Sequence, residues 1–508
     1  MKLLLKFRKE IFILLIIIIA YFILRLPNLT LQPIFADEAI YIRWAQVMRS
    51  EPTLRFLPLS DGKTPLFMWS MIPLFKIFDD PLFAGRFLSV LSGFVTLLGV
   101  VALSWKVFGR RVALWSGLLY VVTPYVVFFD RMALVDSMLS GFTVWSLYFA
   151  IWLAQKVRLD LAMILGFILG GAWLTKTPAI INLLLLPLSV LAFGKDGGNR
   201  GNRVDRYGMV KMIFFWGVAI IIALVLYNAL RLGPNFHLLS SRNADYVFSP
   251  LELVGRPLDP FIPHFRDISD WFPKLLTWPV LILGGIGVIR VIRGKNKLGL
   301  LVLLWALVPL LINMAFLRTF TARYLLPSIP LLLILAAYGL ERVSRGVRVL
   351  RVPQGMIYGM FLSLTVLLPL HFNYQLLTNP PPKALPLEER KGYFEDWTAG
   401  YGFSEIAKFL IDQKKNGSVV VGTEGFFGTL PDGLQIYLDK AEIPIIGSHA
   451  KISEQIKESA VDNLTFFVGN RKSLEGSISG VKLILEYPKV KPLDGSKQDA
   501  IVLYQVLP

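Results

Sequence analysis

Cysteine is absent from the 508-residue chain, which contains only four histidines. The lack of cysteine excludes disulfide bonds, iron–sulfur clusters, thiolate metal sites and cysteine nucleophiles. Charged residues are also scarce: they make up 17% of the chain, against 55% hydrophobic residues, and the mean hydropathy is +0.58. Because soluble proteins contain about 25% charged residues, this composition excludes an ordinary soluble protein. It predicts a polytopic α-helical membrane protein.

Long apolar runs bounded by lysine and arginine predict about eleven transmembrane helices. The first run follows a basic N-terminal segment and lacks a small-residue cleavage site, so we expect an uncleaved anchor. The few ionisable residues within the runs lie near their ends, which disfavours a proton-coupled or ion-coupled transporter. The predicted spans are 11–26, 83–106, 112–128, 137–154, 159–175, 178–194, 212–230, 274–290, 298–317, 324–340 and 353–371.

The net charge of +18 is typical of a protein that meets nucleic acid or an anionic membrane. If the N-terminus is cytoplasmic, most basic residues of the connections fall on the cytoplasmic side. The short outer loops then hold only Arg131, Lys176, Arg318 and Arg323. This positive-inside distribution accounts for the charge, so we expect membrane lipids and no nucleic acid as partners. We predict an integral protein of a prokaryotic plasma membrane, with its C-terminus outside.

The chain divides into a transmembrane part, residues 1–371, and a soluble extracytoplasmic part, residues 372–508. The first part carries two long outer loops, 27–82 and 231–273, and loop 27–82 includes two short amphipathic segments, 39–48 and 65–78. The second part opens with a proline run at 379–382 and then alternates predicted strands and helices, which is typical of a small α/β domain. The expected strands are 419–422, 443–446, 464–468, 481–485 and 501–504, and the expected helices are 403–414 and 452–459.

Carboxylates in the transmembrane part gather in the outer loops, which favours chemistry at the outer membrane surface. Asp37 and Glu38 open the predicted helix 39–48. Acidic residues at this position commonly cap a helix and are favoured by its dipole. Alternatively, a carboxylate at a lipid-facing surface acts as a general base toward a hydroxyl group. The motif Asp130-Arg131-x4-Asp136 indicates either a structural Arg–Asp pair or part of the same site.

Basic residues at the outer edges of apolar segments are candidate phosphate ligands. Lys63 lies in Asp61-Gly-Lys-Thr-Pro65 and precedes the short helix that begins near Pro65. An ammonium group and the N–H groups of a helix start suit an oxyanion, while a lysine that snorkels to the interface is the alternative. Arg323-Tyr324 lies at the outer start of a span, where arginine is either an interfacial anchor or a phosphate ligand.

Taken in order, Asp37-Glu38, Lys63-Thr-Pro65-Leu66, Arg131-x4-Asp136 and Arg323-Tyr324 resemble the GT-C membrane glycosyltransferases. Within these, the chain is similar to the protein O-mannosyltransferase and lipid A aminoarabinose transferase group, over nearly all of residues 1–371. The resemblance implies a polyprenyl-phosphate sugar donor and inverting transfer to a lipid, glycan or protein acceptor at the outer face. It implies that Asp37 is the catalytic carboxylate, supported by Glu38 and Asp136. The implied ligands of the donor phosphate are Lys63, Arg131, Arg323 and Tyr324.

Two positions depart from the pattern of this group. Thr64 replaces a proline, and Gly62 replaces the acidic residue of the aminoarabinose branch. No metal ligand or cofactor is predicted, although a divalent metal stays open. Two other functions are consistent with the motifs: an oligosaccharide ligase that moves a preassembled glycan, and a non-catalytic lipid-glycan flippase or export component. In the last case the outer carboxylates only cap helices.

Overall fold

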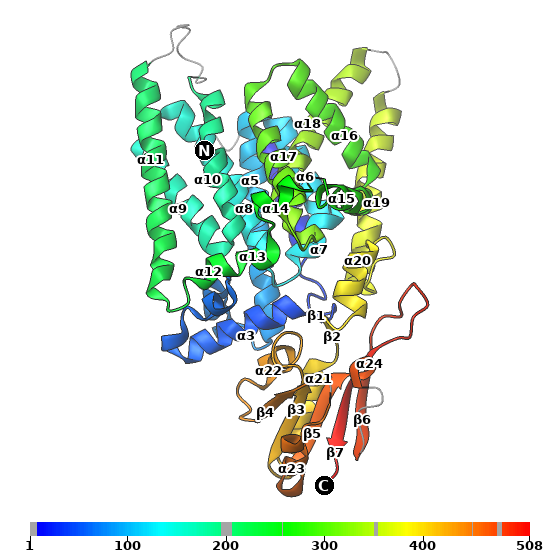
Figure 1. Ribbon diagram of the computed structural model, residues 1–508. Helices are drawn as coiled ribbons and strands as arrows, with labels where there is room; N and C mark the ends of the chain where they lie inside the picture. Colours follow the sequence, from blue (N-terminus) through cyan, green and yellow to red (C-terminus); the bar gives the residue numbers. More distant parts are fainter. Residues whose placement is uncertain (1–7, 195–205, 257, 350–353, 450, 475–479) are drawn as a thin grey trace.

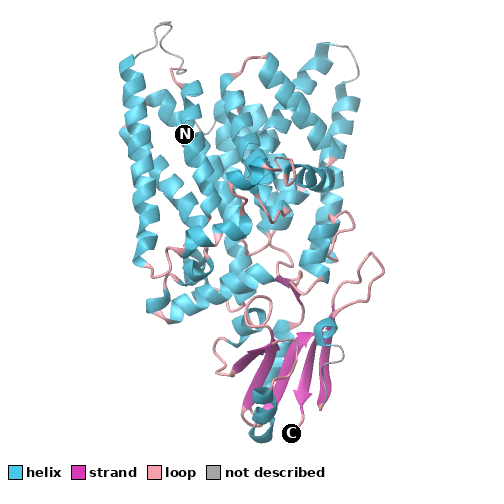
Figure 2. Ribbon diagram, in the orientation of Figure 1, coloured by secondary structure: helices cyan, strands magenta, loops and turns pink. Residues whose placement is uncertain are grey.

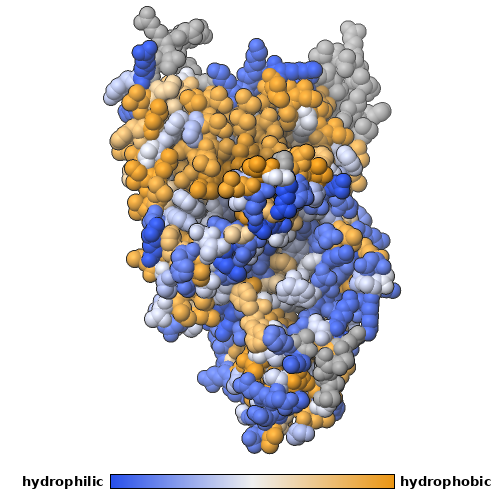
Figure 3. Space-filling view, in the orientation of Figure 1, coloured by the Kyte–Doolittle hydropathy of each residue, from blue (hydrophilic) through white to orange (hydrophobic). Residues whose placement is uncertain are grey.

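The computed structural model describes residues 8–194, 206–256, 258–349, 354–449, 451–474 and 480–508. Long helices form one part of the molecule, and the strands lie almost entirely in a smaller part near the C-terminus (Figure 1; Figure 2). A broad band of apolar side chains covers the visible face of the helical part, and polar side chains dominate lower down (Figure 3). The molecule therefore has a helical body with an apolar surface, and a polar end that contains the strands.

The helical body contains the predicted apolar runs as helices, some of them bent. Helices α6 and α7 form a pair bent by 60°, and α15 and α16 form a pair bent by 111°. The helices are α2 (Arg8–Ile23), α5 (Pro81–Phe108), α6 (Arg110–Val122), α7 (Pro124–Asp130), α8 (Val135–Lys156), α9 (Leu159–Thr175), α10 (Ile180–Leu185), α11 (Arg206–Asn228), α15 (Phe261–Leu275), α16 (Trp278–Arg293), α17 (Lys297–Phe316), α18 (Ile329–Val349) and α19 (Gln354–Thr378).

Within the described residues, five helices are long and apolar enough to cross a membrane, or up to seven if each bent pair is one span. Helix α9 and the segment Thr177–Ala192 are apolar but shorter. The prediction of a polytopic helical protein is thus supported, and the count of eleven spans stays a prediction.

Local sequence explains where helices begin and how closely they pack. Helix α5 begins at Pro81, and the Asp80 carboxylate accepts hydrogen bonds from the Leu82 and Phe83 N–H groups, as an N-cap does. On α9, a Cβ atom at Gly166 would lie 2.7 Å from Cβ of Ile222 on α11. Glycine therefore lets these two helices approach closely, as small residues do in membrane helix pairs.

The two outer loops fold into short helices that lie beside the ends of the long ones. The two amphipathic segments of loop 27–82 form α3 (Ala36–Ser50), then α4 (Leu66–Met71) and the 3-10 turn Ile72–Lys76. The second loop forms α12 (Leu238–Ser241), α13 (Asn243–Tyr246) and α14 (Pro250–Val254) before α15. The 3-10 segment η7 (Ala322–Ser328) leads into α18.

The polar end contains a five-stranded mixed sheet in the order β4-β3-β5-β7-β6. Strand β3 pairs in parallel with β4 and β5, whereas β7 pairs antiparallel with β5 and β6. All five predicted strands are present, β4 two residues later than predicted, as are both predicted helices, here α21 and α23. The elements are α20 (Leu387–Arg390), β2 (Ala399–Gly400), α21 (Phe403–Gln413), β3 (Val419–Glu424), α22 (Asp432–Leu438), β4 (Ile445–Ser448), α23 (Glu454–Asp462), β5 (Leu464–Asn470), α24 (Arg471–Leu474), β6 (Val481–Pro488) and β7 (Ala500–Val506).

The polar end docks on α3, the helix that begins just before Asp37. The Asp439 carboxylate forms ion pairs with Arg43 at 2.8 Å and Arg49 at 2.9 Å, and the Gln46 amide donates to the Ile436 carbonyl. A two-residue strand, β1 (Ile34–Phe35), pairs antiparallel with β2. The C-terminal part therefore contacts the chain on both sides of the Asp37-Glu38 motif.

Candidate active site

A cavity of about 320 Å³ brings together most of the predicted site residues. Its lining comes from α3, the turn before α4, α8, the segment after α9, α13, α17 and η7, so residues nearly 300 positions apart in sequence share one space. Apolar residues such as Leu139, Ile181 and Leu317 also line the cavity. The charged lining residues are Asp37, Lys63, Asp136, Lys176 and Arg323, with Tyr41 and Tyr324 beside them.

Asp37 contacts two of the cations that line this cavity. Its carboxylate bonds with the Arg323 guanidinium at 2.6 Å and lies 3.6 Å from the Lys63 ammonium. Lys63 also pairs with Asp61 at 3.2 Å and lies over the rings of Tyr41 and Trp44. The structure therefore brings Asp37, Lys63 and Arg323 together, although they come from three separate segments.

The cations around Asp37 hold it in its ionised form. Burial acts to raise the pKa of Asp37, but attraction to Arg323 and Lys63 outweighs burial, and the pKa lies well below its ordinary value. Burial acts to lower the pKa of Lys63, but Tyr41, Asp37 and Asp61 raise it above its ordinary value. At neutral pH the carboxylate and the ammonium therefore both carry charge.

Asp136 and Lys176 form a second ion pair in the cavity. The Lys176 ammonium donates to Asp136 Oδ1 at 2.6 Å and lies 4.1 Å from the centroid of the Tyr324 ring. The other Asp136 oxygen, Oδ2, is buried and has no hydrogen-bond partner. A buried acceptor without a partner costs about 1–3 kcal/mol, so this oxygen is available to a donor group of a ligand.

Lys176 is a site residue that the sequence analysis counted only as an outer-loop charge. A signal for it was present: Lys176-Thr-Pro178 repeats the Lys63-Thr-Pro65 motif. Each motif precedes a short helical segment and each contributes its lysine and threonine to the cavity lining. The repeated motif therefore marks both lysines that reach the cavity.

Glu38 points away from the cavity, although it is adjacent to Asp37. Its carboxylate forms two hydrogen bonds of 2.8 Å with the Arg86 guanidinium, and both side chains are fully buried. It also accepts hydrogen bonds from the Phe35 and Ala133 N–H groups. Helix α3 begins at Ala36, so the alternative of a helix cap applies to Glu38 and not to Asp37.

Arg131 is the predicted phosphate ligand that the structure does not bring to the cavity. Its buried guanidinium donates to the carbonyl oxygens of Arg25, Pro27 and Asn28. Its neighbour Asp130 pairs with Arg25 at 2.9 Å rather than with Arg131. Both residues thus fasten the segment after α2 to the α7–α8 turn, and the two terminal nitrogens of the Arg131 guanidinium are used by backbone oxygens.

Cations engage both carboxylates of the cavity. Asp37 bonds with Arg323, and Asp136 bonds with Lys176. Over the described part of the chain, no group of three or more histidine, aspartate or glutamate side chains gathers to hold an ion.

Comparison with known proteins agrees with this arrangement. A family model described as dolichyl-phosphate-mannose-protein mannosyltransferase matches residues 62–228, which include Lys63, Asp136 and Lys176. ArnT from Cupriavidus metallidurans bound to undecaprenyl phosphate aligns over 98% of this chain and 98% of its own, with a TM-score of 0.57 and 15% identity. The chain has the fold of the GT-C superfamily. The resemblance found in the motifs is thereby confirmed.

A second GT-C structure has the same fold. The archaeal oligosaccharyltransferase AglB from Archaeoglobus fulgidus, in complex with an inhibitory peptide and a dolichol-phosphate, aligns over 91% of this chain and 70% of its own. The TM-score is 0.54 and the identity 12%. No curated protein sequence matches the chain. The GT-C fold and the apolar helices together make this an integral membrane protein related to glycosyltransferases.

Proposed function

We propose that the protein is an inverting glycosyltransferase that moves a sugar from a polyprenyl-phosphate donor to an acceptor at the outer membrane face. The observation that carries the proposal is the cluster of Asp37 with Lys63 and Arg323 in the cavity, at 3.6 Å and 2.6 Å. A carboxylate and two cations in one place supply a base for the acceptor and ligands for the donor phosphate.

The charge of the cavity suits a phosphodiester donor. The lining includes three cations, Lys63, Lys176 and Arg323, and two carboxylates, Asp37 and Asp136. One excess positive charge is left, which matches the single negative charge of a sugar linked through one phosphate to a lipid. A lipid diphosphate would bring an additional negative charge, so the cavity favours the monophosphate donor over the diphosphate of many preassembled glycans.

Donor binding would also activate Asp37. In the free protein Arg323 and Lys63 lower the pKa of Asp37, which makes it a weak base. A phosphate that takes hydrogen bonds from the same two cations shares their charge, so the pKa of Asp37 rises when the donor is bound. The base therefore becomes effective only with donor present, and an acceptor hydroxyl loses its proton to Asp37 as its oxygen attacks the sugar.

A second catalytic acid is not needed for this reaction. The lipid phosphate leaves with its charge stabilised by Lys63, Lys176 and Arg323, because preorganised cations stabilise charge that develops in the transition state. With one base and attack from the side opposite the leaving group, the anomeric configuration inverts. Glu38 and Arg131 then act through the structure around the site rather than on the substrate.

Topology is part of the proposal, since the site must face the outside. We propose a cytoplasmic N-terminus and an extracytoplasmic domain at 372–508. In a chain without cysteine, Ser473→Cys on the polar end and Arg293→Cys at the end of α16 are both exposed positions. A membrane-impermeant thiol reagent should label the first but not the second in intact cells. The reverse pattern would overturn the topology.

The test of the proposed function is donor binding and transfer by the full-length protein in liposomes. We expect polyprenyl monophosphate to bind more tightly than polyprenyl diphosphate of the same chain length. Sugar from a panel of polyprenyl-phosphate donors should pass to acceptors in an extract of cell-envelope lipids and glycans. Tighter binding of the diphosphate would favour an oligosaccharide ligase. Movement of the lipid-linked sugar across the bilayer without transfer would favour a flippase.

A further inference from the structure

Glu389 is a buried carboxylate outside the cavity that reaches the backbone beside Arg323. It lies on α20, in the segment that connects α19 to the sheet, and its side chain is only 4% exposed. Its Oε1 atom accepts a hydrogen bond of 2.9 Å from the Ala322 N–H group. Ala322 begins η7 and directly precedes Arg323, so the carboxylate holds the peptide from which the Arg323 side chain starts.

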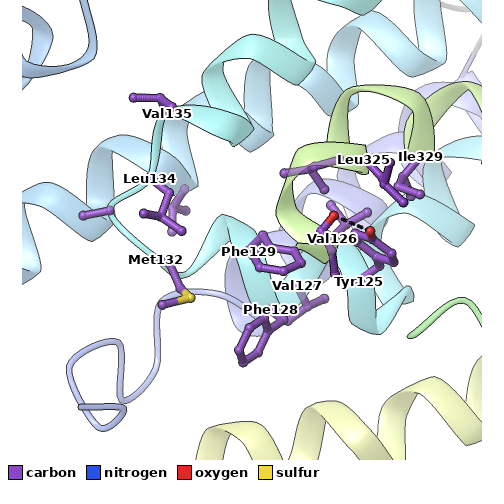
Figure 4. Packing of buried hydrophobic residues seen from close by; sticks show 14 of the residues in the cluster. Tyr125, Val126, Val127, Phe128, Phe129, Met132, Leu134, Val135, Leu325 and Ile329 are labelled. Carbon is purple, nitrogen blue, oxygen red and sulfur yellow. Dashed lines mark hydrogen bonds between the residues drawn. The ribbon is translucent and has the colours of Figure 1, made fainter. Parts of the chain in front are cut away.

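The same residue is fixed from its other side by Tyr125. The Tyr125 hydroxyl on α7 donates to the Ala322 carbonyl oxygen at 2.5 Å. In Figure 4 the Tyr125 ring lies against Leu325 and Ile329, and a dashed line marks this hydrogen bond. Both polar groups of Ala322 therefore have a buried side-chain partner, and the backbone at Arg323 has little freedom to shift.

The segment around Glu389 also holds the chain next to Asp37. The Ala36 N–H group donates to the Thr398 carbonyl at 3.0 Å, and the Tyr393 ring lies 4.5 Å from the Phe35 ring. Arg323 and Asp37 form the 2.6 Å ion pair of the cavity. Residues 389–400 thus contact the residue just before Arg323 and the residues just before Asp37. A side chain held at its base by such contacts is pre-organised for its ligand.

We propose that Glu389 is a positioning residue that sets the Arg323 guanidinium against Asp37 and the donor phosphate. The proposal rests on the proposed function, because it takes the donor phosphate as the ligand of Arg323. It also gives the C-terminal part a role in the reaction: the segment that begins this part fixes the geometry of a site whose lining lies in the helical body.

The charge of Glu389 makes its contribution depend on pH. Burial raises the pKa of Glu389 to about 7. Glu388 also raises this pKa, whereas the hydrogen bond from the Ala322 N–H group and the charge of Arg323 lower it. The titratable groups that face it are Arg323, Glu388, Tyr125 and Tyr393. Above pH 7 the ionised carboxylate is the stronger acceptor for Ala322. Below pH 7 it takes up a proton, the hydrogen bond weakens, and Arg323 is held less firmly.

The test compares Glu389→Gln with Glu388→Gln, a matched change at the exposed neighbour on the same helix. Donor KM and kcat of the full-length protein in liposomes are measured from pH 6 to pH 8. We expect the wild-type donor KM to rise by about threefold or more from pH 8 to pH 6. Glu389→Gln should raise donor KM at pH 8 by a similar factor, remove its pH dependence and leave kcat nearly unchanged. Glu388→Gln should keep the wild-type donor KM at pH 8 and keep a pH dependence, displaced to lower pH because Glu388 no longer raises the pKa of Glu389.

A wild-type KM and pH profile in Glu389→Gln would overturn the proposal, as would a loss of thermal stability with no change in donor KM. If Glu389→Gln does not fold, Tyr125→Phe removes only the hydroxyl on the other side of Ala322. It should raise donor KM and keep the pH dependence; an unchanged KM there also contradicts the proposal. Failure of the proposed function has a different signature, since wild type would then transfer sugar from no polyprenyl-phosphate donor at any pH.

Discussion

Two groups of ionised side chains lie near the start of α3, and they differ in what is left for a ligand. The cavity charges are Asp37, Lys63, Asp136, Lys176 and Arg323, and their side chains are 2–23% exposed. The buried ion pairs are Glu38–Arg86 and Arg25–Asp130, at 0–1% exposed. In the first group Asp136 Oδ2 and Arg323 Nε have no partner, whereas both oxygens of Glu38 are bonded twice.

This difference separates chemistry from architecture among residues of the same type. Asp37 and Glu38 are adjacent, yet one faces three cations of the cavity and the other joins α3 to α5 and the α7–α8 turn. The cavity ion pairs still have groups that can bond to a phosphate, so they serve binding. The buried ion pairs have no such group left, and they hold the surrounding helices in place. Substitutions of the buried ion pairs should therefore mainly change the free energy of unfolding, and substitutions of the cavity charges should mainly change donor binding or transfer rate.

The largest effect on stability is expected for Glu38→Gln. Breaking a buried ion pair leaves an uncompensated charge, here Arg86, and lowers the free energy of unfolding by about 3–5 kcal/mol. The measurement is thermal unfolding of the purified protein in detergent. Asp37→Asn is the matched comparison: its ion pairs also contribute to stability, but they lie at the partly exposed cavity, so it should lower the unfolding temperature less than Glu38→Gln does. Equal unfolding temperatures for both variants would abolish the distinction between the two groups.

A smaller effect is expected for the lysines of the repeated motif. Removing one charge-assisted hydrogen bond to phosphate costs about 1.5–3 kcal/mol, so Lys63→Ala and Lys176→Ala should each weaken polyprenyl-phosphate binding about tenfold or more. Arg131→Lys is the contrast: it should lower the unfolding temperature, because carbonyls of Arg25, Pro27 and Asn28 lose donors. Donor affinity of the folded Arg131→Lys protein should stay unchanged; a tenfold loss there would return Arg131 to the phosphate site.

The smallest expected effect is the response of Asp37 to acid. Because its pKa is lowered in the folded protein, its ion pairs contribute to stability above the unfolded pKa of about 3.9 and are lost only as pH falls below that value. The Glu389→Gln protein lacks the titration of Glu389 near pH 7. In this protein kcat/KM should therefore be flat between about pH 5 and 7. An acid limb within that range would show that Asp37 is not held ionised by Arg323 and Lys63.

Sequence and structure agree best where local pattern decides the outcome. The strands of the polar end followed from patterning, whereas the grouping of Asp37, Lys63 and Arg323 was an implication of the family resemblance that the order of the motifs carries. Arg131 and Arg323 are alike in sequence, both basic at an outer edge, and only the path of the backbone sends one to carbonyl oxygens and the other to Asp37. Glu389 could not be predicted, because its partner Ala322 is 67 residues away and carries no polar side chain.

The most direct test of the central claim is the transfer rate of Asp37→Asn at saturating donor. Asparagine keeps the size of the side chain and removes the base, whose loss typically lowers a rate by about 10²–10⁴-fold. We expect a folded protein that still binds polyprenyl phosphate and transfers sugar at least about a hundredfold more slowly. A wild-type transfer rate in Asp37→Asn would contradict the assignment of Asp37 as the catalytic base.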